Sequence, residues 1–215
     1  MSDKKKSKMN LPNKLTVLRI CMVPIFIVVM MLPASVLSPL ISGIIGTALF
    51  VIASLTDMLD GKIARKYGLV TDFGKLMDPL ADKFMVIGAM TAIVYRTAML
   101  FDNNNQALFI ITLLIVIFRE LAVTSLRLVA SSSGGKVVAA NMMGKMKTVV
   151  QIIFVVVAIM EPVIYAIDGV GSALPAWWVT WLPLSYFFAA LTIFFTVASG
   201  INYFVGLWKY LDPEK

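Results

Sequence analysis

The stretch DMLDGKIARKYGLVTDFGKLMDPLADK (residues 57–83) interrupts a chain that is otherwise strongly apolar. Four of its aspartates form two pairs with helical spacing. Asp57 and Asp60 are three residues apart, and Asp78 and Asp82 are four apart, so on helices each pair would share one face. We expect two helix ends, joined by a loop, to bring these four carboxylates together.

Four carboxylates at one place repel one another unless a cation neutralises them. Oxygen ligands select hard cations such as Mg²⁺, Mn²⁺ or Ca²⁺, and Mg²⁺ leaves coordination positions for substrate phosphates. Gly61 and Gly74 allow close approach to the backbone, and Arg65 offers a planar fork for phosphate. The pattern predicts metal-assisted chemistry on a phosphate compound, with one or two ions. Four other charged residues of the stretch fit no such pattern and are interpreted as ordinary loop residues: Lys62, Lys66, Asp72 and Lys75.

Composition restricts the other possibilities. The chain has 215 residues, of which 60% are hydrophobic and only 14% charged, and it contains no histidine. Imidazole chemistry is therefore excluded, and the single cysteine, Cys21, excludes an internal disulfide and a thiol metal cluster. The net charge of +7 arises from basic residues beside apolar segments, which indicates contact with lipid head groups and not with nucleic acid.

The apolar segments predict an all-α integral membrane protein with six transmembrane helices, since about 20 apolar residues span the hydrocarbon core. The whole chain is interpreted as a single membrane domain, residues 1–215, that begins with a short basic cytoplasmic arm, residues 1–14. The six predicted spans are residues 15–32, 39–56, 79–100, 107–129, 149–167 and 183–205.

The distribution of basic residues predicts the orientation in the membrane. All Lys and Arg residues except Arg96 fall on the side that holds both termini and the aspartate stretch. Because cytoplasmic loops carry the excess of basic residues, both termini and the active site are expected in the cytoplasm, beneath the cell membrane.

The aspartate stretch also resembles a known family. Its pattern, Asp57-x₂-Asp60-Gly61-x₂-Ala64-Arg65-x₈-Gly74-x₃-Asp78-x₃-Asp82, is similar to the signature of the CDP-alcohol phosphotransferases. The resemblance implies that an alcohol hydroxyl attacks the phosphorus beside the lipid of a CDP-linked substrate, and that CMP leaves. It implies a homodimer and Mg²⁺ or Mn²⁺ held by the four paired aspartates, with Asp82 also the general base. The residues implied to bind CDP are Asn13, Thr16, Asp57, Gly61, Ala64, Arg65, Thr71 and Gly74.

Shorter motifs indicate the acceptor alcohol. LPNKLTVLRI, REL, TSLR and GKMKT resemble the bacterial branch that converts CDP-diacylglycerol and sn-glycerol 3-phosphate into phosphatidylglycerol phosphate. An anionic acceptor requires cations, and four basic residues are expected to bind its phosphate: Arg119, Arg127, Lys145 and Lys147.

Alternatives remain open at this point. Lys145 and Lys147 are two residues apart and do not fully share a helical face, so either is also interpretable as a membrane anchor. Arg119 and Glu120 lie in an apolar run, where a charged pair has either a functional role or a role in helix packing. Helix capping alone would explain Asn13 and Thr16.

The sequence is also compatible with two other functions. The first alternative is the same reaction with another acceptor: inositol phosphate, serine or phosphatidylglycerol. The other is a cation-coupled transporter with the aspartates as its ion site, which the lack of a visible internal repeat disfavours.

Overall fold

The computed structural model describes residues 10–68, 71–100, 103–132 and 142–208, and these residues form helices without any strand. The prediction of an all-α protein is therefore confirmed. The elements are α1 (Leu11–Met31), α2 (Pro39–Tyr67), α3 (Asp72–Leu100), α4 (Asn103–Ser132), α5 (Met142–Tyr165), the 3₁₀ turn η1 (Gly171–Ala173), α6 (Ala176–Trp181) and α7 (Pro183–Leu207).

Five helical stretches in the described part of the chain are long and apolar enough to cross a bilayer. They lie in α1, α2, α4 and α5, and in α6 together with α7. The remaining long helix, α3, is not among these five stretches of the described residues, and it carries the charged side chains of Asp82, Lys83 and Arg96. The chain is thus a multi-pass membrane protein, and α3 packs against α1 and α4.

The predicted ends of the second and third helices were wrong. Helix α2 continues past residue 56 to Tyr67, and α3 begins at Asp72 and not at Pro79. Asp72 lies in the first turn of a helix, and Pro79 lies inside it. The two predicted helix ends were placed where the hydropathy falls. A helical backbone satisfies its own hydrogen bonds, however, and can extend beyond the apolar region.

The other helix ends differ less from the prediction. The short helix α6 was not expected. The spans predicted at residues 15–32, 107–129, 149–167 and 183–205 correspond to α1, α4, α5 and α7, whose observed bounds are 11–31, 103–132, 142–165 and 183–207.

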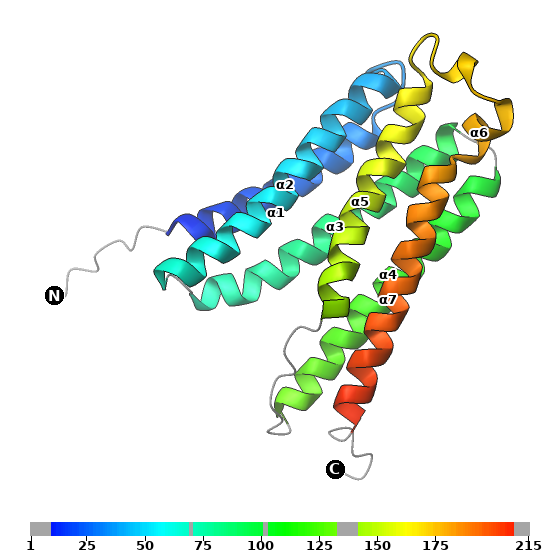
Figure 1. Ribbon diagram of the computed structural model, residues 1–215. Helices are drawn as coiled ribbons and strands as arrows, with labels where there is room; N and C mark the ends of the chain where they lie inside the picture. Colours follow the sequence, from blue (N-terminus) through cyan, green and yellow to red (C-terminus); the bar gives the residue numbers. More distant parts are fainter. Residues whose placement is uncertain (1–9, 69–70, 101–102, 133–141, 209–215) are drawn as a thin grey trace.

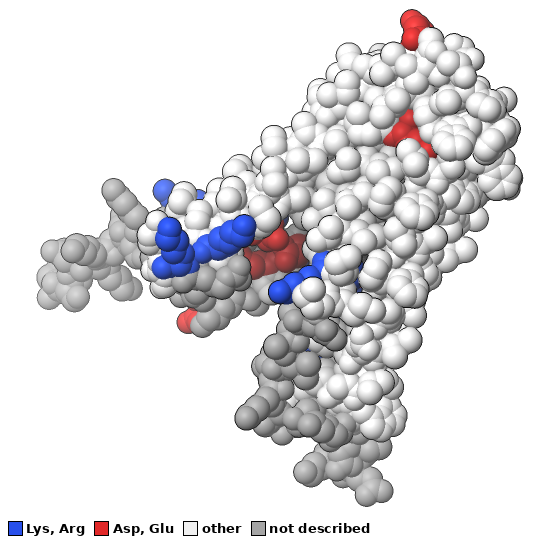
Figure 2. All heavy atoms as spheres, in the orientation of Figure 1, with Lys and Arg blue, Asp and Glu red and all other residues white. Residues whose placement is uncertain are grey.

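The helices form two arms that diverge toward one end of the molecule (Figure 1). Helix α1 packs against α2 and α3, while α7 packs against α4 and α5. The arms join in a core that includes Phe26, Phe50, Phe109 and Phe154. Figure 2 shows acidic side chains in the recess between the arms, with basic side chains on both sides. The recess is where the chemistry-bearing residues of the two arms face one another.

Glu161 fastens α5 to α7 near the other end of the molecule. Its carboxylate accepts hydrogen bonds from the backbone N–H groups of Leu184 (3.0 Å) and Ser185 (2.7 Å). The Tyr165 hydroxyl donates to the same carboxylate at 2.9 Å. A carboxylate that caps the N-terminus of a helix satisfies N–H groups that lack an intrahelical partner. Glu161 therefore has a structural role, and α7 is held in the register that presents its other end to the recess.

Candidate active site

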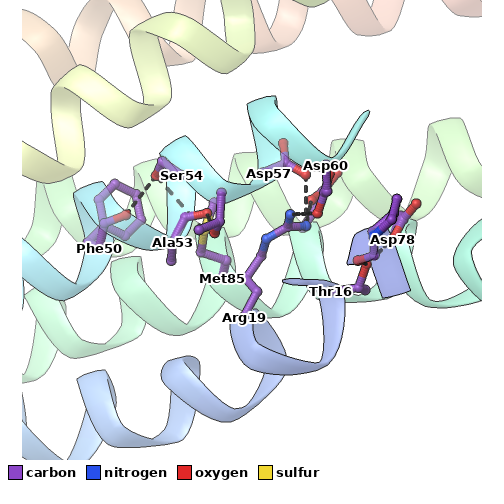
Figure 3. Close-up of polar contacts among 12 residues, drawn as sticks. Thr16, Arg19, Phe50, Ala53, Ser54, Asp57, Asp60, Asp78 and Met85 are labelled. Atoms are coloured by element: carbon purple, nitrogen blue, oxygen red, sulfur yellow. Dashed lines mark hydrogen bonds and ion pairs between the residues drawn. The ribbon is translucent and has the colours of Figure 1, made fainter. Parts of the chain in front are cut away.

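The aspartates of α2 converge on an arginine from α1. Arg19 is fully buried, and its Nη1 lies 2.7 Å from Asp57 Oδ1, while Nη2 contacts Asp60 Oδ2. Figure 3 shows the guanidinium group extending from α1 to both carboxylates. Removing one partner from a buried ion pair costs about 3–5 kcal/mol, because the other charge is left uncompensated. The contact of α1 with α2 therefore depends on these charges being matched.

The aspartates of α3 also contact α1. Asp82 Oδ1 lies 3.2 Å from Nη1 of Arg19, and Asp78 Oδ1 accepts a 2.7 Å hydrogen bond from the Thr16 hydroxyl. The side chain of Asp60 is only 5% exposed, whereas those of Asp57 and Asp82 are 37% and 50% exposed. The structure thus brings the four predicted aspartates to one place, and Asp57 and Asp82 face solvent there.

Three of the residues expected to bind CDP are linked by hydrogen bonds. The Thr71 hydroxyl donates to Asn13 Oδ1 at 2.9 Å and accepts from the backbone N–H of Gly74 at 3.0 Å. A Cβ at Gly74 would lie 3.3 Å from Asn13 Oδ1 and 3.7 Å from Asp78 Oδ2, so the position is tightly enclosed. Asn13 does not cap α1, because Asn10 does so by accepting the backbone N–H of residue 13. Capping alone therefore does not explain Asn13.

The remaining CDP residues lie on the last turns of α2. Gly61 directly follows Asp60 and is half-buried. The side chains of Ala64 and Arg65 lie outside the described part of the structure, so their predicted roles stay predictions.

A second cluster of charges lies on α4, α5 and α7. Arg119 Nη1 lies 3.3 Å from Glu120 Oε1, and Arg119 Nη2 donates to the Ser199 hydroxyl at 2.6 Å. Lys147 is buried and its Nζ contacts the same Glu120 oxygen. Two cations therefore share one carboxylate, which leaves the cluster with an excess of positive charge.

Arg127 joins this cluster through Tyr203. Its Nη2 donates to the Tyr203 hydroxyl at 2.5 Å, and its guanidinium carbon lies 4.8 Å from the centroid of the tyrosine ring. The guanidinium group of Arg119 contacts the same ring at 5.5 Å. Lys145, in contrast, is exposed and has no polar partner among the residues that the structure describes. Of the four predicted acceptor residues, three are brought together and Lys145 is not.

The acidic and basic clusters are neighbours. Thr124 of α4 donates its hydroxyl to the backbone carbonyl of Glu120 at 2.7 Å, beside the basic cluster. The ammonium group of Lys83 donates to the Thr124 hydroxyl at 2.7 Å, which ties α3 to α4 between the clusters. A molecule with two phosphate-bearing parts would find carboxylates and cations within one recess.

Three residues of these clusters were missed by sequence reasoning: Arg19, Ser199 and Tyr203. Arg19 carries a usable signal, because it interrupts an apolar run just as Arg119 does, and charges there are costly and usually functional. Ser199 and Tyr203 carry none, since hydroxyl-bearing residues are common along α7.

The chain is similar to proteins of a known family. A family model described as CDP-alcohol phosphatidyltransferase matches residues 9–198. The chain belongs to the CDP-alcohol phosphatidyltransferase family. The resemblance seen in the aspartate stretch is thereby confirmed over most of the chain.

Several curated relatives of this CDP-alcohol phosphatidyltransferase have the name CDP-diacylglycerol–glycerol-3-phosphate 3-phosphatidyltransferase. One from Bacillus subtilis is 40% identical over 212 residues, which cover 95% of this chain and 98% of the relative. One from Rickettsia typhi is 36% identical over 209 residues, covering 94% and 98%. One from Pseudomonas fluorescens is 29% identical over 211 residues, covering 96% and 94%.

CDP-alcohol phosphatidyltransferases generally depend on a divalent metal. The donor set fits such an ion, because carboxylate oxygens are its preferred ligands and three carboxylates already converge on one cationic group. In the described residues, however, no three acidic side chains are close enough to hold an ion as they stand. The guanidinium group of Arg19 lies among Asp57, Asp60 and Asp82, so a metal ion must share or replace its contacts.

Proposed function

We propose that this CDP-alcohol phosphatidyltransferase transfers the phosphatidyl group of CDP-diacylglycerol to sn-glycerol 3-phosphate, yielding phosphatidylglycerol phosphate and CMP. The observation that carries the proposal is the placement of the four carboxylates beside the cluster of Arg119, Arg127 and Lys147. The first group suits a metal-bound pyrophosphate, and the second suits the phosphate of the acceptor. The names of the relatives that match nearly the whole chain support the same substrates.

The four paired aspartates would hold Mg²⁺ or Mn²⁺, as one or two ions, in this proposal. When bound, the metal would neutralise charge on the phosphoryl oxygens and on the departing CMP. The partly exposed Asp57 and Asp82 would face the substrate, while the buried Asp60 and the Thr16-bound Asp78 would hold the helices in place.

Asp82 is proposed as the general base. It contacts Arg19 in the acidic cluster, it directly precedes Lys83, which is hydrogen-bonded to Thr124 of α4, and half of its side chain is exposed. Its carboxylate would take the proton from a hydroxyl of glycerol 3-phosphate as that oxygen attacks the phosphorus beside the lipid. The new phosphorus–oxygen bond forms while the bond to CMP breaks, and the proton remains on Asp82 until solvent removes it.

The CDP part of the donor would lie along the ends of α1, α2 and α3. The hydrogen-bonded side chains of Asn13 and Thr71 would contact it. Gly74 has no side chain in this enclosed place, so the ligand could approach the backbone closely there. The other residues proposed for this pocket are Thr16, Asp57, Gly61, Ala64 and Arg65.

Arg119, Arg127 and Lys147 are proposed to bind the acceptor's phosphate. Tyr203 contacts both arginines and Glu120 contacts Lys147, so the three cations are held apart and in place before the ligand arrives. Preformed contacts of this kind reduce the entropy lost on binding. Lys145 is exposed, and we assign it to the anionic membrane surface instead.

We propose that the recess and both termini face the cytoplasm and that the protein lies in the cell (inner) membrane, because cytoplasmic loops carry the excess of basic residues. A homodimer is proposed from the family resemblance alone. Both statements rest on the sequence and not on contacts in the structure.

Incubation with radiolabelled CDP-diacylglycerol tests the proposed function. The purified protein in detergent micelles would receive Mg²⁺ and, in separate reactions, glycerol 3-phosphate, inositol phosphate, serine or phosphatidylglycerol. We expect labelled phosphatidylglycerol phosphate and CMP only with glycerol 3-phosphate. Turnover with another acceptor alone would replace the substrate assignment, and no CMP release with any of them would favour the transporter alternative.

Replacing Arg119 by alanine is expected to raise the KM for glycerol 3-phosphate by about 10- to 100-fold, since hydrogen bonds to a charged group contribute about 1.5–3 kcal/mol. The KM for CDP-diacylglycerol should change far less, because Arg119 lies in the basic cluster. Steady-state kinetics with each substrate varied in turn would measure both values.

The matched control is Lys62→Ala, which removes an exposed cation of α2 outside both clusters. It should leave both KM values near those of the original protein. Equal increases in the two KM values for the Arg119 variant would indicate a structural role for that residue.

A further inference from the structure

Arg19 occupies the place where the proposed metal site and the helix α1 meet. It comes from a different helix than any of the carboxylates it contacts, and it is fully buried. Nη1 bridges Asp57 and Asp82, which belong to α2 and α3, and Nη2 contacts Asp60. One guanidinium group therefore joins three helices through three carboxylates.

The charges around Arg19 do not balance. One positive charge faces three carboxylates, and Asp78 lies close by on α3. A carboxylate has two oxygens, and those not used by Arg19 stay available as ligands. The site thus retains enough negative charge to attract a divalent cation while Arg19 is present. A cation held by the same carboxylates would also be repelled by the guanidinium group.

The guanidinium group is also incompletely satisfied. Its Nε is buried and has no hydrogen-bond partner among the described residues. Buried polar groups are nearly always paired, so this N–H, like the buried Nε of Arg96 and of Arg119, remains available to donate to a further group.

We propose that Arg19 is a built-in counter-ion of the metal site. It holds α1, α2 and α3 together when no divalent cation is bound, and it gives up carboxylate contacts when the cation enters. This inference rests on the proposed metal site. Its consequence is that Arg19 weakens cation binding, because each binding event must first separate the guanidinium group from its carboxylates.

The experiment compares the cation affinity of the original protein with that of Arg19→Gln. Each protein would be purified in detergent, freed of metal with a chelator and titrated with Mn²⁺, with free Mn²⁺ measured by electron paramagnetic resonance. Without the competing charge, Arg19→Gln should bind Mn²⁺ about 5- to 150-fold more tightly, the range that is typical when one interaction changes the free energy of another binding event. Its melting temperature without metal should be lower than that of the original protein, and added Mn²⁺ should narrow the difference.

Two further variants sharpen the comparison. Arg19→Lys keeps a positive charge but cannot contact three carboxylates with a planar fork, so its affinity should be intermediate. Lys62→Gln removes one positive charge two residues from Asp60 on the exposed side of α2, and its Mn²⁺ affinity should equal that of the original protein.

The outcomes separate this inference from the proposed function. If the original protein binds Mn²⁺ and Arg19→Gln binds it equally or more weakly, the counter-ion role is wrong while the metal site stands. If no protein binds Mn²⁺, the metal site and this inference both fall. If Arg19→Gln folds only with metal present, that result supports the counter-ion role. The affinity test then uses Arg19→Lys, and Mn²⁺ binding equal to or weaker than that of the original protein overturns the counter-ion role.

Discussion

Replacing Asp82 by asparagine is expected to lower kcat by about 10²- to 10⁴-fold, the usual contribution of a general base. Asparagine has the same shape but cannot take a proton from the acceptor hydroxyl. The affinity for CDP-diacylglycerol should change little, because Asp57, Asp60 and Asp78 remain. Turnover at saturating Mg²⁺ and equilibrium binding of labelled CDP-diacylglycerol would measure the two quantities separately.

Asp72→Asn is the matched control for this variant. Asp72 is exposed in the first turn of α3, so asparagine removes only a surface charge near the helix N-terminus, worth about 0.3–1 kcal/mol of stability. Its kcat should therefore stay close to that of the original protein. A kcat within about tenfold of the original for Asp82→Asn would remove Asp82 as the general base.

Removing divalent metal is expected to abolish turnover completely and reversibly. The carboxylates alone would repel the pyrophosphate of the donor, so no productive complex should form without a cation. Activity measured after treatment with a chelator should return on addition of Mg²⁺ or Mn²⁺. Chelator-resistant turnover would contradict the metal-dependent mechanism.

The fold should survive the same treatment. Arg19 already compensates part of the negative charge of Asp57, Asp60 and Asp82, so the helices α1, α2 and α3 have a reason to stay together. Circular dichroism of the chelator-treated protein should retain its helical signal at room temperature. A loss of helical signal together with activity would show that the metal, and not Arg19, holds the three helices.

Hydropathy located the helices but not their ends. The apolar part of α2 stops near residue 56, yet the helix continues to Tyr67 and carries both Asp57 and Asp60 on its extension. Helix α3 likewise begins at Asp72, before its apolar part. The membrane determines where apolar residues are needed, and this requirement is visible in the composition. Backbone hydrogen bonds determine where a helix ends, and they leave no such signal in the composition.

The pairing of the aspartates, and the metal chemistry proposed for them, could be predicted without any structure. Residues three or four apart on one helix share a face regardless of what packs against it, so Asp57 and Asp60 could be paired, as could Asp78 and Asp82. The oxygen-only donor set then indicated a hard cation. None of these steps needed the position of any other helix.

The distant residues that join the two clusters could not be predicted, because they depend on how the helices pack. Arg19 on α1 contacts carboxylates of α2 and α3, and Tyr203 on α7 contacts both arginines of α4. Periodicity relates residues within one helix, whereas contacts between helices depend on how their side chains interlock across the whole bundle. A buried arginine in an apolar helix signals that some partner exists, but the packing of the helices determines that its partners are the aspartates.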